Sequence, residues 1–281
     1  MAIASALRTA ALTLADVSDT PRLDAELLMA DALGVTRSTL LLTRMADAAP
    51  DTFAGHLSRR LLHEPVAYIT GRQEFWSLDL AVSPAVLIPR ADSETLIEAA
   101  QDALSHAPPR RILDLGTGSG ALLLAALTEW PDASGVGIDA SLPALEVALA
   151  NATALGLGDR ASLKRIDWRI SGWTDQCDSP FDLVLANPPY VEADAALAPQ
   201  VMAHEPHSAL FAGAQGLDDY RILMPALGDL LTSNGIAILE IGAAQRSAVT
   251  ALANQSGFDA LCRCDLGGRD RALILRRAGQ R

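Results

Sequence analysis

Residues 111–121 read RILDLGTGSGA, and this stretch decides the fold prediction. An apolar strand runs directly into a glycine-rich turn, and an apolar helix follows the turn. Glycines allow a tight turn, and because they carry no Cβ they let a ligand approach the backbone closely. A glycine-rich turn between a strand and a helix is typical of nucleotide-binding α/β proteins. The stretch therefore predicts a cofactor loop.

The sequence around this loop alternates between strand and helix patterns from Ala91 onward. Such alternation indicates a sheet wrapped by helices on both faces. In these sheets ligands bind at the carboxyl ends of the strands, near the point where the strand order reverses. We expect a doubly wound, Rossmann-like α/β sheet of seven strands at 111–115, 135–139, 161–166, 181–186, 235–241, 258–264 and 271–276, with helices at about 92–106, 120–130, 142–155, 218–232 and 244–255.

The residues before Ala91 predict a small helical domain and a connector. Asp19-Thr20-Pro21 is a helix start, and the apolar stripe that follows ends at Gly34. Between Gly71 and Pro89 the apolar residues alternate, which favours a hairpin. We expect three parts: an N-terminal helical domain at 1–72, a hairpin linker at 73–90 and the cofactor-binding domain at 91–281.

Composition limits the classes of partner. The formal net charge of −12 opposes non-specific binding to phosphate backbones, so we expect no direct binding of nucleic acid. No stretch approaches the 18 or so apolar residues of a membrane span. The three cysteines are too few and too irregularly spaced for a disulfide framework. We expect a cytoplasmic monomer that does not associate with membranes.

The cofactor loop fits two classes of cofactor. Gly116, Gly118 and Ala121 satisfy the dinucleotide pattern G-x-G-x-x-A. Asp114 argues against a dinucleotide, because a carboxylate beside the loop would repel a pyrophosphate. The same carboxylate can bind the ammonium of a methionine-like tail. The loop therefore favours S-adenosylmethionine, which carries that cation and no phosphate.

Acidic residues also end the next two expected strands. Asp139 can accept hydrogen bonds from both ribose hydroxyls of an adenosine cofactor, whichever class it belongs to. Asp167 could accept the adenine amine, and Trp168 could line the adenine face. We therefore expect an adenosine site along three strand ends.

The tetrapeptide Asn187-Pro188-Pro189-Tyr190 follows the fourth expected strand. Consecutive prolines stiffen the turn and display carbonyl acceptors. If the Asn187 side-chain oxygen and the Pro188 carbonyl each accept one N–H, a planar nitrogen is held for methyl transfer, and Tyr190 can stack on the flat group. Asn-Pro and Pro-Pro are also ordinary loop punctuation, so the tetrapeptide has a purely structural reading as well.

These motifs resemble those of the release-factor glutamine methyltransferase family, which shares Asn-Pro-Pro-Tyr with adenine and cytosine amino-methyltransferases. The likeness also includes residues within 71–78, 82–84, 87–94, 205–206, 210–220, 239–242 and 265–271. It implies a class I methyltransferase that uses S-adenosylmethionine to methylate the glutamine of the Gly-Gly-Gln loop of bacterial-type class 1 release factors. By this match the cofactor would contact Gly116, Thr117, Gly118, Ser119, Gly120, Asp139, Trp168 and Asn187, and the glutamine would contact Asn187 to Tyr190.

Two other substrates are compatible with the same motifs. A sister group resembling this one methylates a glutamine of a large-subunit ribosomal protein, and an adenine amino-methyltransferase would act on DNA or RNA. A non-enzymatic docking role is a third alternative. His204 and His207 lie three apart, as metal ligands can, but Pro206 disfavours a helix there, so we expect no metal site.

Overall fold

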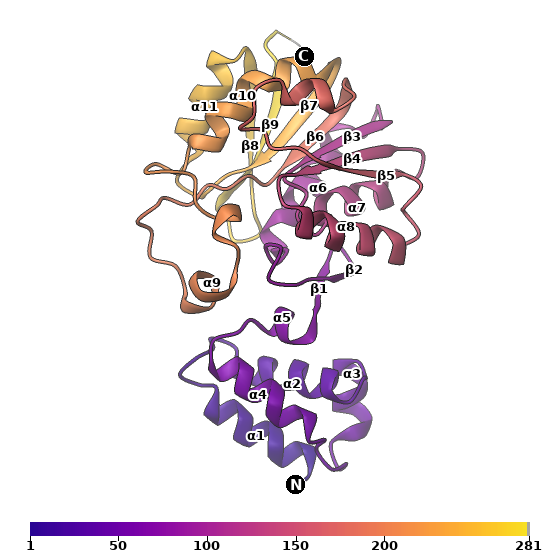
Figure 1. Cartoon of the computed structure of the whole chain (residues 1–281), viewed down its shortest axis with the longest axis vertical. Coiled ribbons are helices and arrows are strands. Elements are labelled where there is room, and N and C mark those ends of the chain that lie inside the picture. The colour runs from indigo at the N-terminus through magenta and orange to yellow at the C-terminus, as the bar shows by residue number, and fades with distance from the viewer. Residues whose placement is uncertain (280–281) are drawn as a thin grey trace. The chain divides into compact units, whose positions relative to one another are not determined.

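A seven-stranded sheet forms the centre of the larger of two units (Figure 1). The structure is a computed structural model, and it describes residues 1–279. The smaller unit contains residues 1–72 and 197–205, and the larger one contains 73–196 and the residues from Pro206 onward.

The larger unit holds all the strands that the sequence predicted for the main sheet. Its strands are β3 (Arg111–Leu115), β4 (Ser134–Asp139), β5 (Ala161–Arg165), β6 (Phe181–Ala186), β7 (Leu231–Glu240), β8 (Phe258–Cys264) and β9 (Asp270–Arg277). Its helices are η2 (Ala91–Ser93), α6 (Glu94–Ala103), α7 (Ala121–Glu129), α8 (Leu142–Ala154), η3 (Trp173–Gln176), η4 (His207–Ala209), α10 (Asp218–Leu230) and α11 (Arg246–Gln255). The predicted α/β fold class is confirmed.

The strand order is β5-β4-β3-β6-β7-β9-β8. Strands β3 to β7 are parallel to one another, and β9 is antiparallel to both β7 and β8. The chain builds outward from β3 to β5 and then returns to place β6 on the other side of β3, so the order reverses between β3 and β6. Leu115 pairs with Ala186, which places the turns after these two strands at the same level of the sheet.

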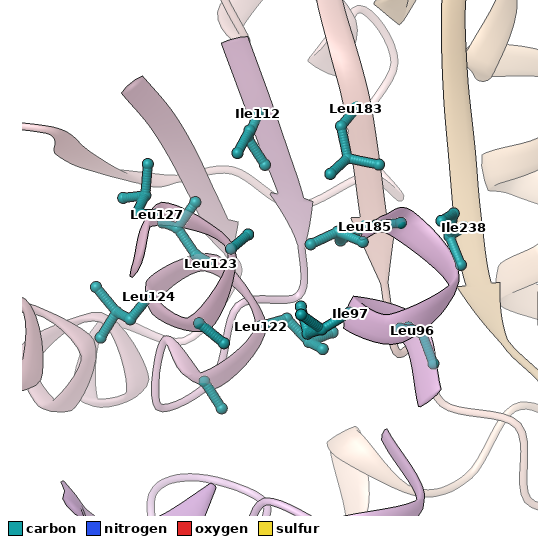
Figure 2. Close-up of a cluster of buried hydrophobic side chains, with 14 of the residues drawn as sticks. Leu96, Ile97, Ile112, Leu122, Leu123, Leu124, Leu127, Leu183, Leu185 and Ile238 are labelled. Atoms are coloured by element: carbon teal, nitrogen blue, oxygen red, sulfur yellow. The ribbon is translucent and has the colours of Figure 1, made fainter. Parts of the chain in front are cut away.

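Two apolar layers cover the sheet because successive strand residues face opposite sides. Leu183 and Leu185 pack against α6 and α7 in one cluster, whereas Val184 and Ala186 pack against α10 and α11 in the other. Figure 2 shows the first cluster, in which leucines of α7 meet Ile112 of β3. Helix α7 is apolar all round, and its residues Ala121 to Leu127 are all buried.

The predicted hairpin exists and is fixed to the larger unit. Strands β1 (Arg72–Phe75) and β2 (Leu78–Ala81) pair in a two-stranded sheet. At the tip, the Trp76 backbone N–H donates to Glu94 Oε1 at 2.8 Å, and its indole donates to Glu129 Oε1 at 2.7 Å. The buried Asn151 side chain of α8 accepts from the Ala81 N–H at 2.7 Å and donates to the Ala81 carbonyl at 3.0 Å. The hairpin from Gln73 onward is therefore part of the larger unit.

The smaller unit is helical, as expected. Its elements are α1 (Ile3–Thr13), α2 (Pro21–Ala32), α3 (Arg37–Thr39), η1 (Leu40–Arg44), α4 (Thr52–Leu61), α5 (Val66–Thr70) and α9 (Pro199–His204). Helix α2 begins at Pro21, and Gly34, which closes its carboxyl end, has a φ of +63°. Apolar residues of α1, α2 and α4 form the core, among them Leu7, Leu28 and Phe53.

The smaller unit also contains residues 197–205, and the local sequence of this segment did not predict that it belongs there. The buried Arg60 donates to Asp24 Oδ2 at 2.7 Å and to Gln200 Oε1 at 3.1 Å, and His204 Nε2 lies 3.1 Å from the Leu62 carbonyl oxygen. Residues 197–205 thus belong with the N-terminal helices, although residues 91–281 were expected to form one domain. The roles assigned to the three predicted parts stay predictions. Within residues 1–279, no helix is long and apolar enough to cross a membrane.

Candidate functional site

The candidate site lies at the carboxyl ends of β3, β4 and β6, where the strand order reverses. One pocket brings together most of the predicted residues: Asp114, Gly116, Thr117, Gly118, Ser119, Asp139, Asp167, Trp168, Asn187 and Pro189. Gly120, Pro188 and Tyr190 do not line it. Gly120 directly precedes α7, and Pro188, the second residue of the turn, is buried. The pocket also contains residues that the sequence did not single out as ligands, including Phe75, Ile88, Ser93 and Ser141.

Asp114 is a buried carboxylate with one oxygen unused by the protein. The Thr117 hydroxyl donates to Oδ2 at 2.7 Å, whereas Oδ1 is buried without a hydrogen-bond partner among the described residues. Burial raises the pKa of Asp114 to about 7. A buried carboxylate oxygen of this kind is costly unless a ligand satisfies it. Because Asp114 lines the pocket, a cationic ligand is the chemistry that its free oxygen fits.

The glycine turn folds over the end of β4 and is held by Asp139. The N–H groups of Gly116 and Thr117 both donate to the Ile138 carbonyl at 2.9 Å. Asp139 Oδ2 accepts from the Gly118 N–H at 3.0 Å, and Oδ1 accepts from the Ser141 N–H at 2.8 Å. Burial raises the pKa of Asp139. Each oxygen retains a second lone pair, so the carboxylate can shape the loop and still accept from a diol.

Gly116 has to be glycine for two reasons. Its φ is +73°, a backbone conformation that side chains disfavour, and a Cβ at this position would lie 3.0 Å from the Trp168 ring. The ring of Trp168 therefore lies directly against the cofactor loop. This contact supports the expectation that Trp168 forms one wall of a flat binding slot.

Asp219 orients Trp168, and nothing near it in the sequence indicated that role. Asp219 lies at the start of α10, is 1% exposed and accepts from Trp168 Nε1 at 2.7 Å. Arg169 donates to the same Oδ1 atom at 3.1 Å. The predicted acceptor Asp167 lies in the pocket and accepts from the Arg169 backbone N–H at 2.9 Å. Asp219 is thus a support for the pocket wall, whereas Asp167 belongs to the pocket itself.

The Asn187 to Tyr190 turn is held from behind. Gln245 Nε2 donates to the Tyr190 carbonyl at 2.9 Å and to the Gly216 carbonyl at 3.2 Å. Gly216 has a φ of +65°, and a Cβ there would lie 2.2 Å from the Tyr190 carbonyl oxygen. The Tyr190 hydroxyl donates to Glu240 Oε1 at 3.0 Å, and burial raises its pKa far above the ordinary value. The turn is therefore rigid, as the two prolines suggested.

His204 and His207 do not form a joint site. His204 ends α9 and His207 begins η4, with Pro206 between them. Across residues 1–279 no cluster of His, Cys, Asp and Glu side chains has the geometry to hold a metal ion. The segment after Tyr190 contains α9 and η4, and an isolated bridge pairs Val191 with Phe211.

Solved structures agree with this architecture at the level of the fold. The hMettl16 catalytic domain in complex with the MAT2A 3′UTR hairpin 6 matches with a TM-score of 0.57 and 14% identity, over 80% of this chain and 82% of that one. A methyltransferase from Pyrococcus furiosus matches with a TM-score of 0.50 and 15% identity, over 79% of this chain and 98% of that one. These neighbours show a methyltransferase fold.

Sequence comparisons are more specific. Residues 5–71 match the family described as PrmC N-terminal domain, and residues 91–214 match the methyltransferase small domain. A protein of Rhodospirillum rubrum named release factor glutamine methyltransferase is 42% identical, over 92% of this chain and 79% of that protein. Proteins of the same name from Agrobacterium fabrum and Salmonella typhimurium are 40% and 38% identical, over 95% and 90% of this chain and 93% and 91% of their own lengths. The chain belongs to the release factor glutamine methyltransferase family.

Proposed function

We propose that this protein transfers a methyl group from S-adenosylmethionine to the side-chain amide nitrogen of the glutamine in the Gly-Gly-Gln loop of bacterial-type class 1 release factors. One observation carries the proposal. The unpartnered Asp114 oxygen and the rigid Asn187 turn lie in the same pocket, so a cation site and a site for a planar nitrogen adjoin. Membership of the family supplies the substrate class.

The residues of the pocket fit S-adenosylmethionine. Asp114 Oδ1 would accept from the ammonium of the methionine part, Asp139 from the ribose hydroxyls and Asp167 from the adenine amine, with Trp168 against the adenine face. The backbone of Gly116 to Ser119 would border the ligand, together with the side chains of Thr117 and Ser119. When bound, S-adenosylmethionine supplies an electrophilic methyl group on a positively charged sulfur.

The protein's contribution to transfer is orientation. An amide nitrogen is a weak nucleophile because its lone pair is delocalised. Asn187 Oδ1 and the Pro188 carbonyl would each accept one N–H of the substrate amide, which fixes the direction of the nitrogen lone pair, and Tyr190 would bound the flat group. Because the turn is rigid, it loses little conformational freedom when it binds the substrate amide. More of the energy of these contacts is therefore available to stabilise the transition state.

The remaining expectations concern the partner and its setting. We expect the protein to act as a monomer in the cytoplasm, with the helical unit helping to bind the protein substrate. We also expect no direct binding of nucleic acid, given the formal net charge of −12.

The test is intact-mass spectrometry of an unmethylated release factor incubated with this protein and S-adenosylmethionine, followed by peptide mapping. We expect one added methyl group on the Gly-Gly-Gln glutamine. The matched control is a release factor in which that glutamine is replaced by glutamate, which should gain none. No methylation by a protein that binds the cofactor would reject this substrate, and the large-subunit ribosomal proteins and then nucleic acids would be tried in the same assay.

A further inference from the structure

Glu240 is a buried carboxylate beneath the catalytic turn. It ends β7, is 1% exposed and does not line the pocket. Ile236 and Ile238 face α6 and α7, so the alternation of the strand places Glu240 on the same face, where α6 begins. A charge buried in this way needs partners.

Three side chains surround the Glu240 carboxylate. The Ser93 hydroxyl donates to Oε2 at 2.5 Å, the Tyr190 hydroxyl donates to Oε1 at 3.0 Å, and Arg271 Nη1 lies 3.8 Å from Oε1. Ser93 in turn lies 3.2 Å from Asn187 Nδ2. One carboxylate therefore reaches both ends of the catalytic tetrapeptide, Tyr190 directly and Asn187 through one hydroxyl.

The number of available protons determines which group donates in each of the hydrogen bonds that join Glu240, Ser93 and Asn187. An ionised carboxylate only accepts hydrogen bonds, and a serine hydroxyl has a single proton to donate. Because Ser93 gives its proton to Glu240, it can only accept from Asn187, and the Asn187 amide must turn its NH₂ group toward Ser93. The Oδ1 atom of the same planar amide then faces the opposite way.

We propose that Glu240 and Ser93 are positioning residues that set the orientation of the Asn187 amide, so that its oxygen rather than its NH₂ group meets the substrate nitrogen. The inference rests on the proposed function, in which Asn187 Oδ1 accepts a substrate N–H. With the amide reversed, two N–H donors would face each other and the substrate nitrogen would lose its alignment. The same carboxylate fixes the Tyr190 ring beside the acceptor site.

The protonation state of Glu240 matters for this arrangement. Burial raises its pKa, against the hydrogen bond from Ser93 and the charge of Arg271. The charged and titratable groups around it are Asp92 before α6, Tyr190, Tyr220 of α10, whose hydroxyl donates to the Glu240 carbonyl, and Arg271 of β9, which also pairs with Asp265 and Asp92. A protonated Glu240 can donate to Ser93. Ser93 could then donate to Asn187, which would reverse the orientation of the Asn187 amide. Turnover at saturating cofactor should therefore fall as the pH drops through the Glu240 pKa.

The experiment compares Glu240→Gln and Ser93→Ala with the wild-type protein. Glu240→Gln keeps the size of the side chain but can donate to Ser93. Ser93→Ala removes the hydroxyl between Glu240 and Asn187 and leaves Glu240 its contacts with Tyr190 and Arg271. For both we expect single-turnover methylation to fall roughly 10- to 100-fold while the Kd for S-adenosylmethionine stays within about twofold. Glu240→Gln should also lose the acid limb of the pH profile. The control is Asp182→Asn at the opposite end of β6, where Oδ2 accepts from two backbone N–H groups and an amide oxygen can replace it.

A second readout is independent of methyl transfer. In ¹⁵N NMR spectra the side-chain NH₂ signals of Asn187, assigned by their loss in Asn187→Ala, should shift in Glu240→Gln and Ser93→Ala and not in Asp182→Asn. Unchanged Asn187 signals, or wild-type turnover in both variants, would overturn the proposal. A parallel loss of cofactor affinity, melting temperature and turnover would show a purely structural role and overturn it too. If the wild-type protein methylated no release factor, the proposed function would fail, while the NMR signals would still report on the orientation of the amide.

Discussion

The indole nitrogen of Trp168 lies 2.7 Å from Asp219 Oδ1, and 51 residues separate the two in the chain. This hydrogen bond holds the ring against Gly116, on the wall of the pocket. Asp219→Ala removes the acceptor, so the ring has to be ordered by the ligand. We expect the Kd for S-adenosylmethionine, measured by calorimetry, to rise roughly three- to tenfold. Asp219→Asn keeps an acceptor oxygen and should bind almost as the wild type does; equal weakening in both variants would argue against the role given to the hydrogen bond.

Replacing Asp114 by asparagine should stabilise the ligand-free protein and weaken cofactor binding. Burial raises the Asp114 pKa to about 7, so the folded state holds this proton more tightly than the unfolded state. The stability due to the proton is complete below the unfolded pKa and is lost as the pH rises through about 7. Urea unfolding without ligand should therefore show a gain for Asp114→Asn on the order of a few kcal/mol near pH 8, shrinking toward pH 4. A variant less stable than the wild type near pH 8 would contradict this account.

Cofactor affinity should depend on pH through the same group. An ammonium beside Asp114 favours the ionised carboxylate, so binding below pH 7 or so should release a proton and tighten as the pH rises. Affinity should fall again above about pH 8, where the α-amino group of the ligand loses its own proton. Calorimetry in two buffers of different ionisation enthalpy measures the released proton. Asp114→Asn should lack the rise, and an affinity independent of pH in the wild type would count against the ammonium site.

Asn187→Ala should separate binding from transfer. The side chain lines the pocket and donates to the Ser93 hydroxyl, and its proposed role is to hold the substrate nitrogen. We expect the Kd for S-adenosylmethionine to change little and the rate of methyl transfer, measured in single turnovers, to drop by about 10²-fold or more. Full activity in this variant would remove Asn187 from the mechanism.

Asn151→Ala should loosen the hairpin. The Asn151 amide bonds both polar groups of Ala81 and donates to the Ser119 carbonyl at 2.9 Å, so it joins the hairpin to the cofactor loop. Its loss leaves the buried Ser119 carbonyl and both polar groups of Ala81 without this partner, which costs about 1–3 kcal/mol. Urea unfolding should show that loss, and the Ala81 amide should exchange its hydrogen faster. Thr153→Ala, which removes an exposed hydroxyl on the same helix, is the matched control and should change neither.

The parts of the site that could be predicted are those whose roles are local in the sequence. Asp114, Asp139 and Asn187 each lie at or next to the carboxyl end of an apolar strand, and parallel strands bring such positions to one edge of the sheet. The pattern of strands and helices likewise predicted the seven strands, because a buried strand needs apolar residues on both faces.

The parts that could not be predicted depend on contacts between distant segments. Asp219 at the start of α10 accepts a hydrogen bond from Trp168. Glu240 accepts one from Ser93, which lies 147 positions earlier in the sequence. Nothing near Asp219 or Glu240 in the sequence identifies these partners. The partners are determined by the strand order and by the packing of α6 and α10 on opposite faces of the sheet. The placement of residues 197–205 with the N-terminal helices was missed for the same reason, since its basis is the distant pairing of Arg60 with Gln200.

That placement means that the polypeptide passes between the two units three times, after Arg72, after Ala196 and after Glu205. The helical unit is therefore not an appendage that can be removed by cutting the chain once. A protein shortened to begin at Gln73 would keep α9 but lose the helices that pack with it, and the orphaned segment would begin seven residues after Tyr190. Transplanting the helical unit of one family member onto another would have to exchange two stretches of sequence together, because neither makes a complete unit alone.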